Sequence, residues 1–365
     1  MENKWSEEEI KKLKDLFNAG LSYYEISQRL GRTYYSVDHK IRSLGLNRSN
    51  INVEDKISIT DVINIIRQYI QELKINPPNF KVSKSTGKQK EIANLVISDI
   101  HAGMVNKFYD PTSQSEIITY NDEIRKKQML SYVQSVYSIY NLLKNSYYFE
   151  KLNIFVLGDI ITNDRIFEGQ TFNISKAVGE QIWDVVFDLA YMINRLSGFF
   201  ENIEVYCVVG NHGRTTREPT EEPTTNNFEY HLYKILELLL KENKRIKVIV
   251  PTTKFYSIKN YNHSIFFSHG DTIRGSTITY VEKKAKELLI NLPEGYETYI
   301  LAHRHKADRI SLSPTSEVLI NGSWIKYDEY AFKLYGTTTK PIQYFFGTSR
   351  KRPISWLFQI DFEGM

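Results

Sequence analysis

The chain has 365 residues, of which 41% are hydrophobic and 25% charged, and its formal net charge is +4. This length suffices for one large core plus a small module, and so mild a charge neither requires nor excludes nucleic acid as a partner. No apolar run reaches the roughly 18 residues of a membrane span, the N-terminus lacks the apolar core of a signal peptide, and the single cysteine, Cys207, lies within an apolar run. These features predict a cytoplasmic protein in a reducing compartment that does not bind membranes.

Residues 1–48 contain three short stretches with the apolar spacing of amphipathic helices. Ser6 is expected to cap the first helix, with Glu9 completing a capping box. Ser22 and Thr33 open the second and third helices in a similar way. A glycine ends each helix: Gly20, Gly31 and Gly45. The sequence therefore predicts a small N-terminal three-helix bundle.

This segment resembles the Myb/SANT-like or homeodomain-like helix-turn-helix class, through Trp5, the turn at residues 20–22 and the run from Gly31 to Leu44. The resemblance implies that the third helix enters the major groove of DNA. The residues expected to contact phosphates or bases are Arg32, Thr33, Tyr34, Tyr35, Ser36, His39, Lys40 and Arg42. Because acidic and basic residues nearly balance in this segment, a helical protein-interaction module is the alternative.

Residues 49–90 are predicted to join two domains. Apolar residues follow helical spacing through residues 59–73, and Pro77 and Pro78 end the pattern. The apolar face of this helix could pack on the following domain or pair with a second copy to make a homodimer, and the sequence leaves both open. Residues 81–90 are basic and contain serine and glycine, which is typical of a linker.

Five short polar motifs follow β-rich apolar runs in residues 91–365. They are Asp99-Ile100-His101, Gly158-Asp159, Gly210-Asn211-His212, His269-Gly270-Asp271 and His303-Arg304-His305. Loops that follow neighbouring strands converge at one edge of a sheet. Carboxylate, amide and imidazole groups without a thiolate suit a divalent ion, Mn²⁺ first, with Fe²⁺ or Zn²⁺ as alternatives.

The order of these motifs resembles the calcineurin-like metallophosphoesterase superfamily over residues 91–365. The resemblance implies an α/β fold, a two-sheet β-sandwich flanked by helices, with two metal ions at one sheet edge. It also implies the ligands: Asp99, His101 and His305 for one ion, Asn211, His269 and His303 for the other, and Asp159 as the bridge. In the family a water held between the ions attacks the phosphate. His212 would act on the leaving group or the transition state instead of binding metal.

The motifs depart from the family pattern at two positions. Gly213 follows His212 where many relatives have an acidic residue that orients the histidine, and Ala302 replaces a glycine. We therefore consider Asp271 or Asp164 as the orienting group. Two arginines that follow the motif are expected to contact phosphate: Arg214 and Arg217.

The remaining elements of this domain are predicted from periodicity. Helices are expected over residues 122–143, 175–196 and 232–240, so strands and helices alternate as in an α/β fold. Aromatic and polar residues alternate through residues 323–346, which predicts strands that close the second sheet.

A DNA-binding module tethered to a phosphoesterase raises the local concentration of the enzyme at DNA. We therefore predict a metal-dependent DNA phosphodiesterase, a nuclease resembling a stand-alone phage or bacterial enzyme. Two alternatives stay open. One is a small-molecule phosphatase or nucleotide phosphodiesterase whose helical module serves assembly. The other is a non-catalytic DNA-binding regulator, against which the intact set of predicted ligands argues.

Overall fold

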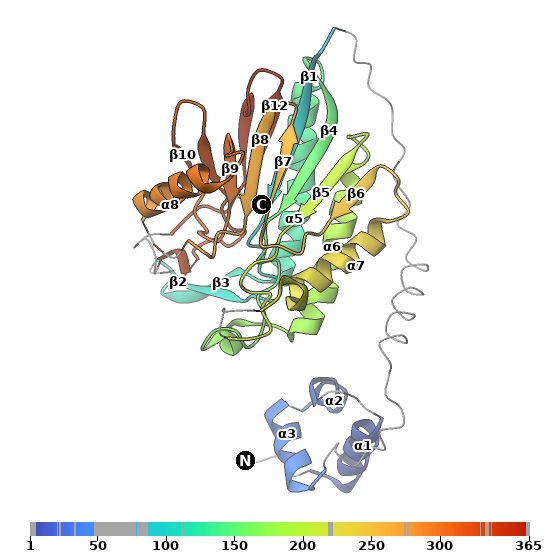
Figure 1. Cartoon of the computed structure of the whole chain (residues 1–365). Helices are drawn as coiled ribbons and strands as arrows, with labels where there is room; N and C mark the ends of the chain where they lie inside the picture. Colours follow the sequence, from blue (N-terminus) through green and yellow to red (C-terminus); the bar gives the residue numbers. More distant parts are fainter. Residues whose placement is uncertain are drawn as a thin grey trace. The chain divides into compact units, whose positions relative to one another are not determined.

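The computed structural model describes the following residues: 5–19, 21, 23–32, 34–46, 78, 87–110, 112–217, 222–273, 275, 277–328, 330–332, 336 and 338–362. The chain divides into two compact units, residues 1–69 and 70–365, and each is considered by itself (Figure 1). The helix predicted over residues 59–73 and its role in dimer formation lie outside the described residues. The domain boundaries predicted at residues 48 and 90 stay predictions.

The first unit is a small helical bundle. Its helices are α1 (Glu7–Asn18), α2 (Tyr23–Leu30) and α3 (Tyr34–Ser43). The capping box is present: the Ser6 hydroxyl accepts from the Glu9 backbone N–H at 3.2 Å, and the Glu9 carboxylate accepts from the Ser6 N–H at 2.9 Å. The side chains that the helices bury against one another are Leu13, Phe17, Ile26, Val37 and Ile41. This apolar contact, more than helix propensity, holds such short helices together.

Arg32 ties the start of α1 to the turn between α2 and α3. Its guanidinium donates to both oxygens of Glu9, at 3.0 and 2.9 Å, and lies 4.8 Å from the centre of the Trp5 ring. The hydrogen bond from Arg32 lowers the pKa of Glu9 to about 2. Arg32 therefore already has partners within the bundle.

The second unit contains two β-sheets. The first sheet has the order β13-β12-β1-β4-β5-β6, and β1, β4, β5 and β6 run parallel (Figure 1). Its strands are β13 (Trp356–Asp361), β12 (Ile342–Ser349), β1 (Gln89–Ile97), β4 (Tyr147–Val156), β5 (Ile203–Cys207) and β6 (Ile246–Ile249).

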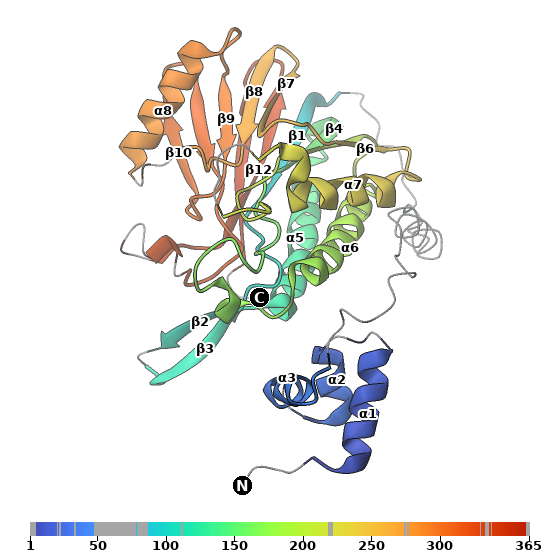
Figure 2. The same ribbon diagram turned by 60° about the horizontal axis from the view of Figure 1, so that its bottom comes forward.

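The second sheet has the order β10-β11-β9-β8-β7, with β8, β9 and β11 parallel. Its strands are β10 (Asp308–Ser311), β11 (Glu317–Ile320), β9 (Thr298–Leu301), β8 (His263–Ser268) and β7 (Phe255–Asn260). A hairpin of β2 (Asn106–Asp110) and β3 (Ser115–Tyr120) is separate from both sheets (Figure 2).

Helices cover the outer faces of the two sheets. The helices are α5 (Asp122–Leu143), α6 (Val178–Leu196), α7 (Phe228–Leu240) and α8 (Ile278–Asn291), and short 3₁₀ turns span Gln170–Asn173 and Thr224–Asn226. α5, α6 and α7 bury apolar residues against the first sheet, and α8 does so against the second (Figures 1 and 2). A third apolar cluster fills the space between the sheets, including Val96, Phe155 and Phe267. The predicted α/β two-sheet sandwich flanked by helices is thus confirmed.

The predicted helices of this unit occur close to their expected bounds. The helix expected over 175–196 begins at Val178. The Ser175 hydroxyl lies outside it, within hydrogen-bond distance of the Gly103 carbonyl and the Asp122 carboxylate. The helix expected over 232–240 begins earlier, at Phe228, because the Asn227 side chain caps it by accepting from the Glu229 N–H.

The prediction that residues 323–346 close the second sheet is wrong. Of the described residues in this range, only those from Ile342 onward form a strand, β12, and it pairs with β1 in the first sheet. Trp324 instead packs in the core, on Tyr132 and Phe362, without a strand. Tyr330 and Phe332, farther along the same range, are exposed, so the aromatic alternation does not mark a strand there.

None of the described helices is long and apolar enough to cross a lipid bilayer.

Candidate metal centre

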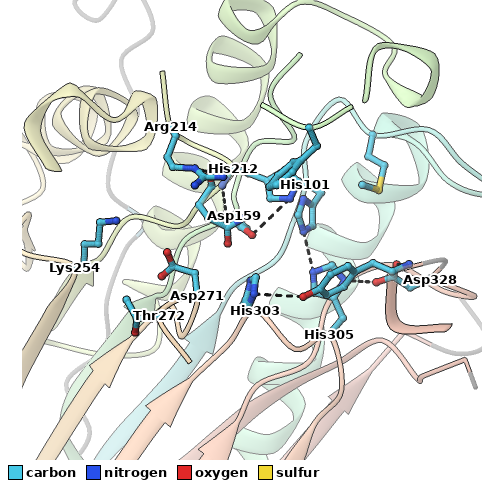
Figure 3. Close-up of a pocket in the computed structure, with 14 residues that line it drawn as sticks. His101, Asp159, His212, Arg214, Lys254, Asp271, Thr272, His303, His305 and Asp328 are labelled. Atoms are coloured by element: carbon cyan, nitrogen blue, oxygen red, sulfur yellow. Dashed lines mark hydrogen bonds and ion pairs between the residues drawn. The ribbon is translucent and has the colours of Figure 1, made fainter. Parts of the chain in front are cut away.

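The five predicted motifs meet at one end of the sandwich. The first sheet contributes the loops after the parallel strands β1, β4 and β5, and the second sheet contributes those after the parallel strands β8 and β9. Parallel strands end at the same edge of a sheet, so their polar residues converge there (Figure 3). The predicted ligands are largely shielded from solvent: Asp99, His101, Asp159, Asn211, His269 and His305 are buried, and His303 is half-buried.

Five of the predicted ligands have left-handed backbone conformations. They are Asp99 (φ 52°), His101 (φ 49°), Asp159 (φ 52°), His303 (φ 68°) and His305 (φ 55°). Among the described residues, nine non-glycine residues have positive φ, so the site holds more than half of them. This conformation is strained for any residue that has a Cβ, and it costs free energy. Such strain concentrates at functional sites.

One group of donors contains Asp99, His101 and His305. The Nε2 atoms of His101 and His305 are 3.1 Å apart, and the His305 Nε2 is 3.4 Å from the Asp99 Oδ1. The other nitrogen of His305, Nδ1, donates to the carboxylate of Asp328, so its Nε2 faces the donor group. The Asp99 Oδ1 is buried and has no hydrogen-bond partner. Electron pairs that face one another in a buried site are stabilised by a cation.

The second group contains Asp159, His269 and His303. The His269 Nδ1 donates to the Leu157 carbonyl at 2.7 Å, so its Nε2 turns toward the Asp159 Oδ2 and the Asn211 Oδ1, each at 3.0 Å. Burial by itself lowers the pKa of His269, but the Asp159 carboxylate outweighs it and raises the pKa to about 10. The charge that holds a proton here can equally hold a divalent ion, which would displace that proton.

Asp159 links the two groups. It also lies in a third group of potential ligand atoms, with His101 and His212. Its Oδ1 accepts from the His212 backbone N–H at 2.8 Å, while its Oδ2 faces His269. A carboxylate shared between two neighbouring donor groups has the placement that the predicted bridge requires.

The backbone carbonyl of Thr162 orients His212. The His212 Nδ1 donates to it at 2.7 Å, which leaves the Nε2 3.9 Å from the Asp159 Oδ2. Asp164, one expected orienting group, instead accepts from the Val178 N–H. The other, Asp271, lines the cavity, whereas the His212 Nδ1 is bonded to the Thr162 carbonyl. The orienting group predicted from the sequence is therefore wrong.

Two glycines allow the loops of Asp159 and Asn211 to touch. A Cβ at Gly158, where φ is +78°, would lie 2.3 Å from the Gly210 nitrogen. A Cβ at Gly210 would lie 2.2 Å from the Asp159 Oδ1. A side chain at either position would therefore push the bridging carboxylate away from Asn211.

Glu229, on α7, holds the same two loops from behind. This fully buried carboxylate accepts from the Ile160 N–H at 2.5 Å and from the Gly210 N–H at 2.6 Å. Asn227 adds a bond to the Gly210 carbonyl at 3.0 Å. A Cβ at Gly213 would meet the Asn227 Oδ1 at 2.0 Å and the Glu229 Cγ at 2.7 Å. Asn227 and Glu229 thus fill the space that the missing acidic residue at position 213 would need.

A cavity of about 690 Å³ opens over these groups. Arg214 lines it, and its Nε donates to the Asn211 carbonyl at 2.9 Å. Arg217 does not line it; this exposed arginine donates to the Arg165 carbonyl. The lining residues that the sequence did not indicate are Met104, Phe167, Lys254, Thr272, Asp328 and Tyr330. Several of them are labelled in Figure 3.

The residues predicted to contact DNA belong to the first unit. Arg32 has the internal partners described above, and Thr33 lies outside the described residues. The others are on α3: Tyr34, Tyr35, Ser36, His39, Lys40 and Arg42. His39 and Arg42 are exposed, and Lys40 is half-buried. Contacts of these residues with DNA stay a prediction.

Comparison with known proteins gives one family match and several solved structures that align with most of the chain. The family model of the GcrA cell cycle regulator matches residues 3–119. A predicted phosphoesterase from Streptococcus pneumoniae covers 74% of this chain and 98% of its own, at 11% identity and a TM-score of 0.29. Vps29 from Chaetomium thermophilum covers 74% and 98%, at 11% identity and a TM-score of 0.31. A dimetal phosphatase from Danio rerio covers 74% and 99%, at 10% identity and a TM-score of 0.33.

No curated protein matches the sequence significantly. The identities and TM-scores are too low to transfer the function of those proteins to this chain. Its chemistry is inferred from the residues of its own site.

Replacing Asp159 with alanine should remove the group that links both donor sets. We expect Asp159→Ala to bind fewer divalent ions after dialysis against Mn²⁺, measured by elemental analysis, with its circular dichroism unchanged. Asp271→Ala is the matched control, because Asp271 lines the cavity but belongs to none of the donor groups. Two ions bound by Asp159→Ala with full hydrolytic activity would contradict a dinuclear site.

Glu229→Gln tests the support behind the loops. Glutamine has one acceptor oxygen, so its amide N–H₂ must face one of the two backbone N–H donors. We expect a loss of about 1–3 kcal/mol in the free energy of unfolding and a metal affinity about 10–100-fold weaker, measured by chemical denaturation and metal titration. Glu237→Gln, on the exposed side of the same helix, should leave metal affinity unchanged. Equal metal affinity in both variants would rule out the supporting role.

Proposed function

We propose that the chain is a dinuclear metal-dependent phosphodiesterase that acts on DNA. The observation that supports the proposal is the convergence of buried carboxylate, amide and imidazole groups on both sides of Asp159. The proposed ligands are those predicted from the sequence: Asp99, His101 and His305; Asn211, His269 and His303; and Asp159 between them. The oxygen and imidazole donors suit Mn²⁺, with Fe²⁺ or Zn²⁺ as alternatives.

Two divalent ions bound here would acidify a water and offset negative charge on a phosphate ester. Asn211 is neutral, so it leaves more positive charge for an anionic substrate than a carboxylate would. Arg214 and Lys254, both lining the cavity, add positive charge beside it. The site is therefore suited to a phosphate anion.

His212 is the proposed catalytic residue. The Thr162 carbonyl fixes its Nδ1–H, so the Nε2 is the nitrogen that can exchange a proton with a substrate oxygen. Burial lowers the pKa of His212, although the Asp159 carboxylate and the Thr162 carbonyl oppose this effect. A neutral imidazole at rest can accept a proton and return it to a leaving oxygen.

DNA is the proposed substrate because α3 of the first unit carries His39, Lys40 and Arg42 within one turn, in a bundle tethered to the phosphoesterase unit. A basic helix of this kind binds the phosphate backbone, and the tether would concentrate the enzyme on DNA. The cavity volume favours a second candidate, a nucleotide phosphodiesterase, since about 300–1,000 Å³ is usual for small-molecule sites. A regulator without catalysis, as the GcrA family description suggests, would have no use for the buried donors.

His212→Ala should keep the bound ions and lower kcat by about 10²–10⁴-fold. The assay is Mn²⁺-dependent hydrolysis of a simple phosphodiester and of DNA, with metal content measured in parallel. His231→Ala, at an exposed position on α7, is the control and should have the activity of the unmodified chain. Loss of an ion from His212→Ala would instead make His212 a ligand.

Exchanging Lys40 and Arg42 for alanine tests the choice of DNA over small molecules. We expect weaker DNA binding by the full chain, with the slope of log affinity against log salt reduced by about 2, one for each lost phosphate contact. Hydrolysis of a simple phosphodiester should not change. The matched control is Lys11→Ala with Lys12→Ala, which removes the same charge from exposed positions on α1. Equal DNA binding by the two double variants would favour the nucleotide phosphodiesterase.

A further inference from the structure

Phe167 is an exposed aromatic residue of the cavity wall. Its side chain lines the cavity and is 40% exposed. Its ring centre lies 4.8 Å from that of His212, and the Arg214 guanidinium lies 5.6 Å from it. The exposed ring therefore stands directly beside the proposed catalytic residue.

The backbone that carries Phe167 is held in place. The side-chain oxygen of Gln170 accepts from the Ile166 N–H at 2.9 Å and the Phe167 N–H at 3.1 Å. Gln170 is itself buried, and its amide nitrogen donates to the Thr162 carbonyl that also orients His212. The backbone of Phe167 is thus fixed relative to His212.

A second exposed aromatic ring lines the cavity among the residues of the second sheet. Tyr330 is 36% exposed, its hydroxyl lies 3.3 Å from the His303 Nε2, and its ring centre is 4.9 Å from that of His305. The cavity therefore has one exposed aromatic side chain beside His212 and another beside His303 and His305. Flat apolar rings beside a phosphate site offer stacking surfaces for nucleobases, at about 1–3 kcal/mol for each base.

A base can use such a surface only when its own face is open. Within a duplex, neighbouring base pairs cover both faces of each base, and a base must leave the stack to enter a pocket. Resting on the proposed function, we infer that the substrate is DNA with an unpaired base next to the scissile phosphate, and that this base stacks on Phe167. Single strands and frayed or flapped ends meet this requirement, and intact duplex does not.

A purely supporting role for Phe167 makes a different prediction. If the ring only positions His212, its removal lowers the rate on every phosphodiester alike. If the ring stacks on a base, its removal matters only when that base is present. The chain offers a matched control in Phe172, which belongs to the 3₁₀ turn Gln170–Asn173, is 88% exposed and does not line the cavity.

The experiment compares the full chain with its Phe167→Ala and Phe172→Ala variants on a short single-stranded oligonucleotide. One version carries 2-aminopurine beside the scissile phosphate, and another carries an abasic residue at that position. We expect binding to quench the 2-aminopurine fluorescence in the unmodified chain and in Phe172→Ala but not in Phe167→Ala. For Phe167→Ala, KM for the base-containing oligonucleotide should rise about 5- to 150-fold, with little change for the abasic one.

Each result is decisive. An equal loss of kcat on both oligonucleotides, with quenching retained, overturns the inference and leaves Phe167 a positioning residue for His212. Cleavage of intact duplex as fast as of single strands also overturns it, while leaving the nuclease function in place. Failure of the unmodified chain to hydrolyse any DNA with Mn²⁺ defeats the proposed function instead, and the 2-aminopurine signal still reports whether a base stacks on Phe167.

Discussion

The second unit depends on one electrostatic constraint. Several buried carboxylate, amide and imidazole groups of the candidate metal centre must lie close together despite their mutual repulsion. Hydrogen bonds to carbonyl and carboxylate groups turn His269 and His305 so that their Nε2 atoms face inward. Left-handed backbone at Asp99 and Asp159, among others, holds the donors at that distance. This arrangement therefore lowers the stability of the fold unless positive charge lies between the donor groups.

The support for this arrangement comes from contacts that no short motif contains. Glu229 reaches Ile160, 69 residues away in the chain, and Gly210, and Asn227 fills the space beside Gly213. An acidic residue directly after His212 could not fit, because its Cβ would collide with these groups. The glycine at position 213 therefore has a steric explanation.

Local patterns in the sequence predicted the strands that precede each motif and the helices of both units, because periodicity and capping residues act over a few residues. They could not predict the Thr162 carbonyl as the orienting group of His212, since a backbone atom leaves no trace in side-chain identity. Asp328 was missed because its partner, His305, is 23 residues away. The aromatic alternation from Trp324 onward misled the prediction, because aromatic residues occupy a core position at Trp324 and an exposed cavity position at Tyr330 without forming a strand.

The two donor groups also have a mechanical consequence. Asp99 and His101 come from the first sheet and His305 from the second, and Asp159 and Asn211 likewise meet His269 and His303 across the sandwich. An ion bound in either group would cross-link the sheets, in a chain whose single cysteine, Cys207, has no partner for a disulfide. At a metal concentration 100 times its dissociation constant, such a clasp adds about 2.7 kcal/mol to the free energy of unfolding. The concentration of metal would then set the folding stability of the second unit as well as the activity of its site.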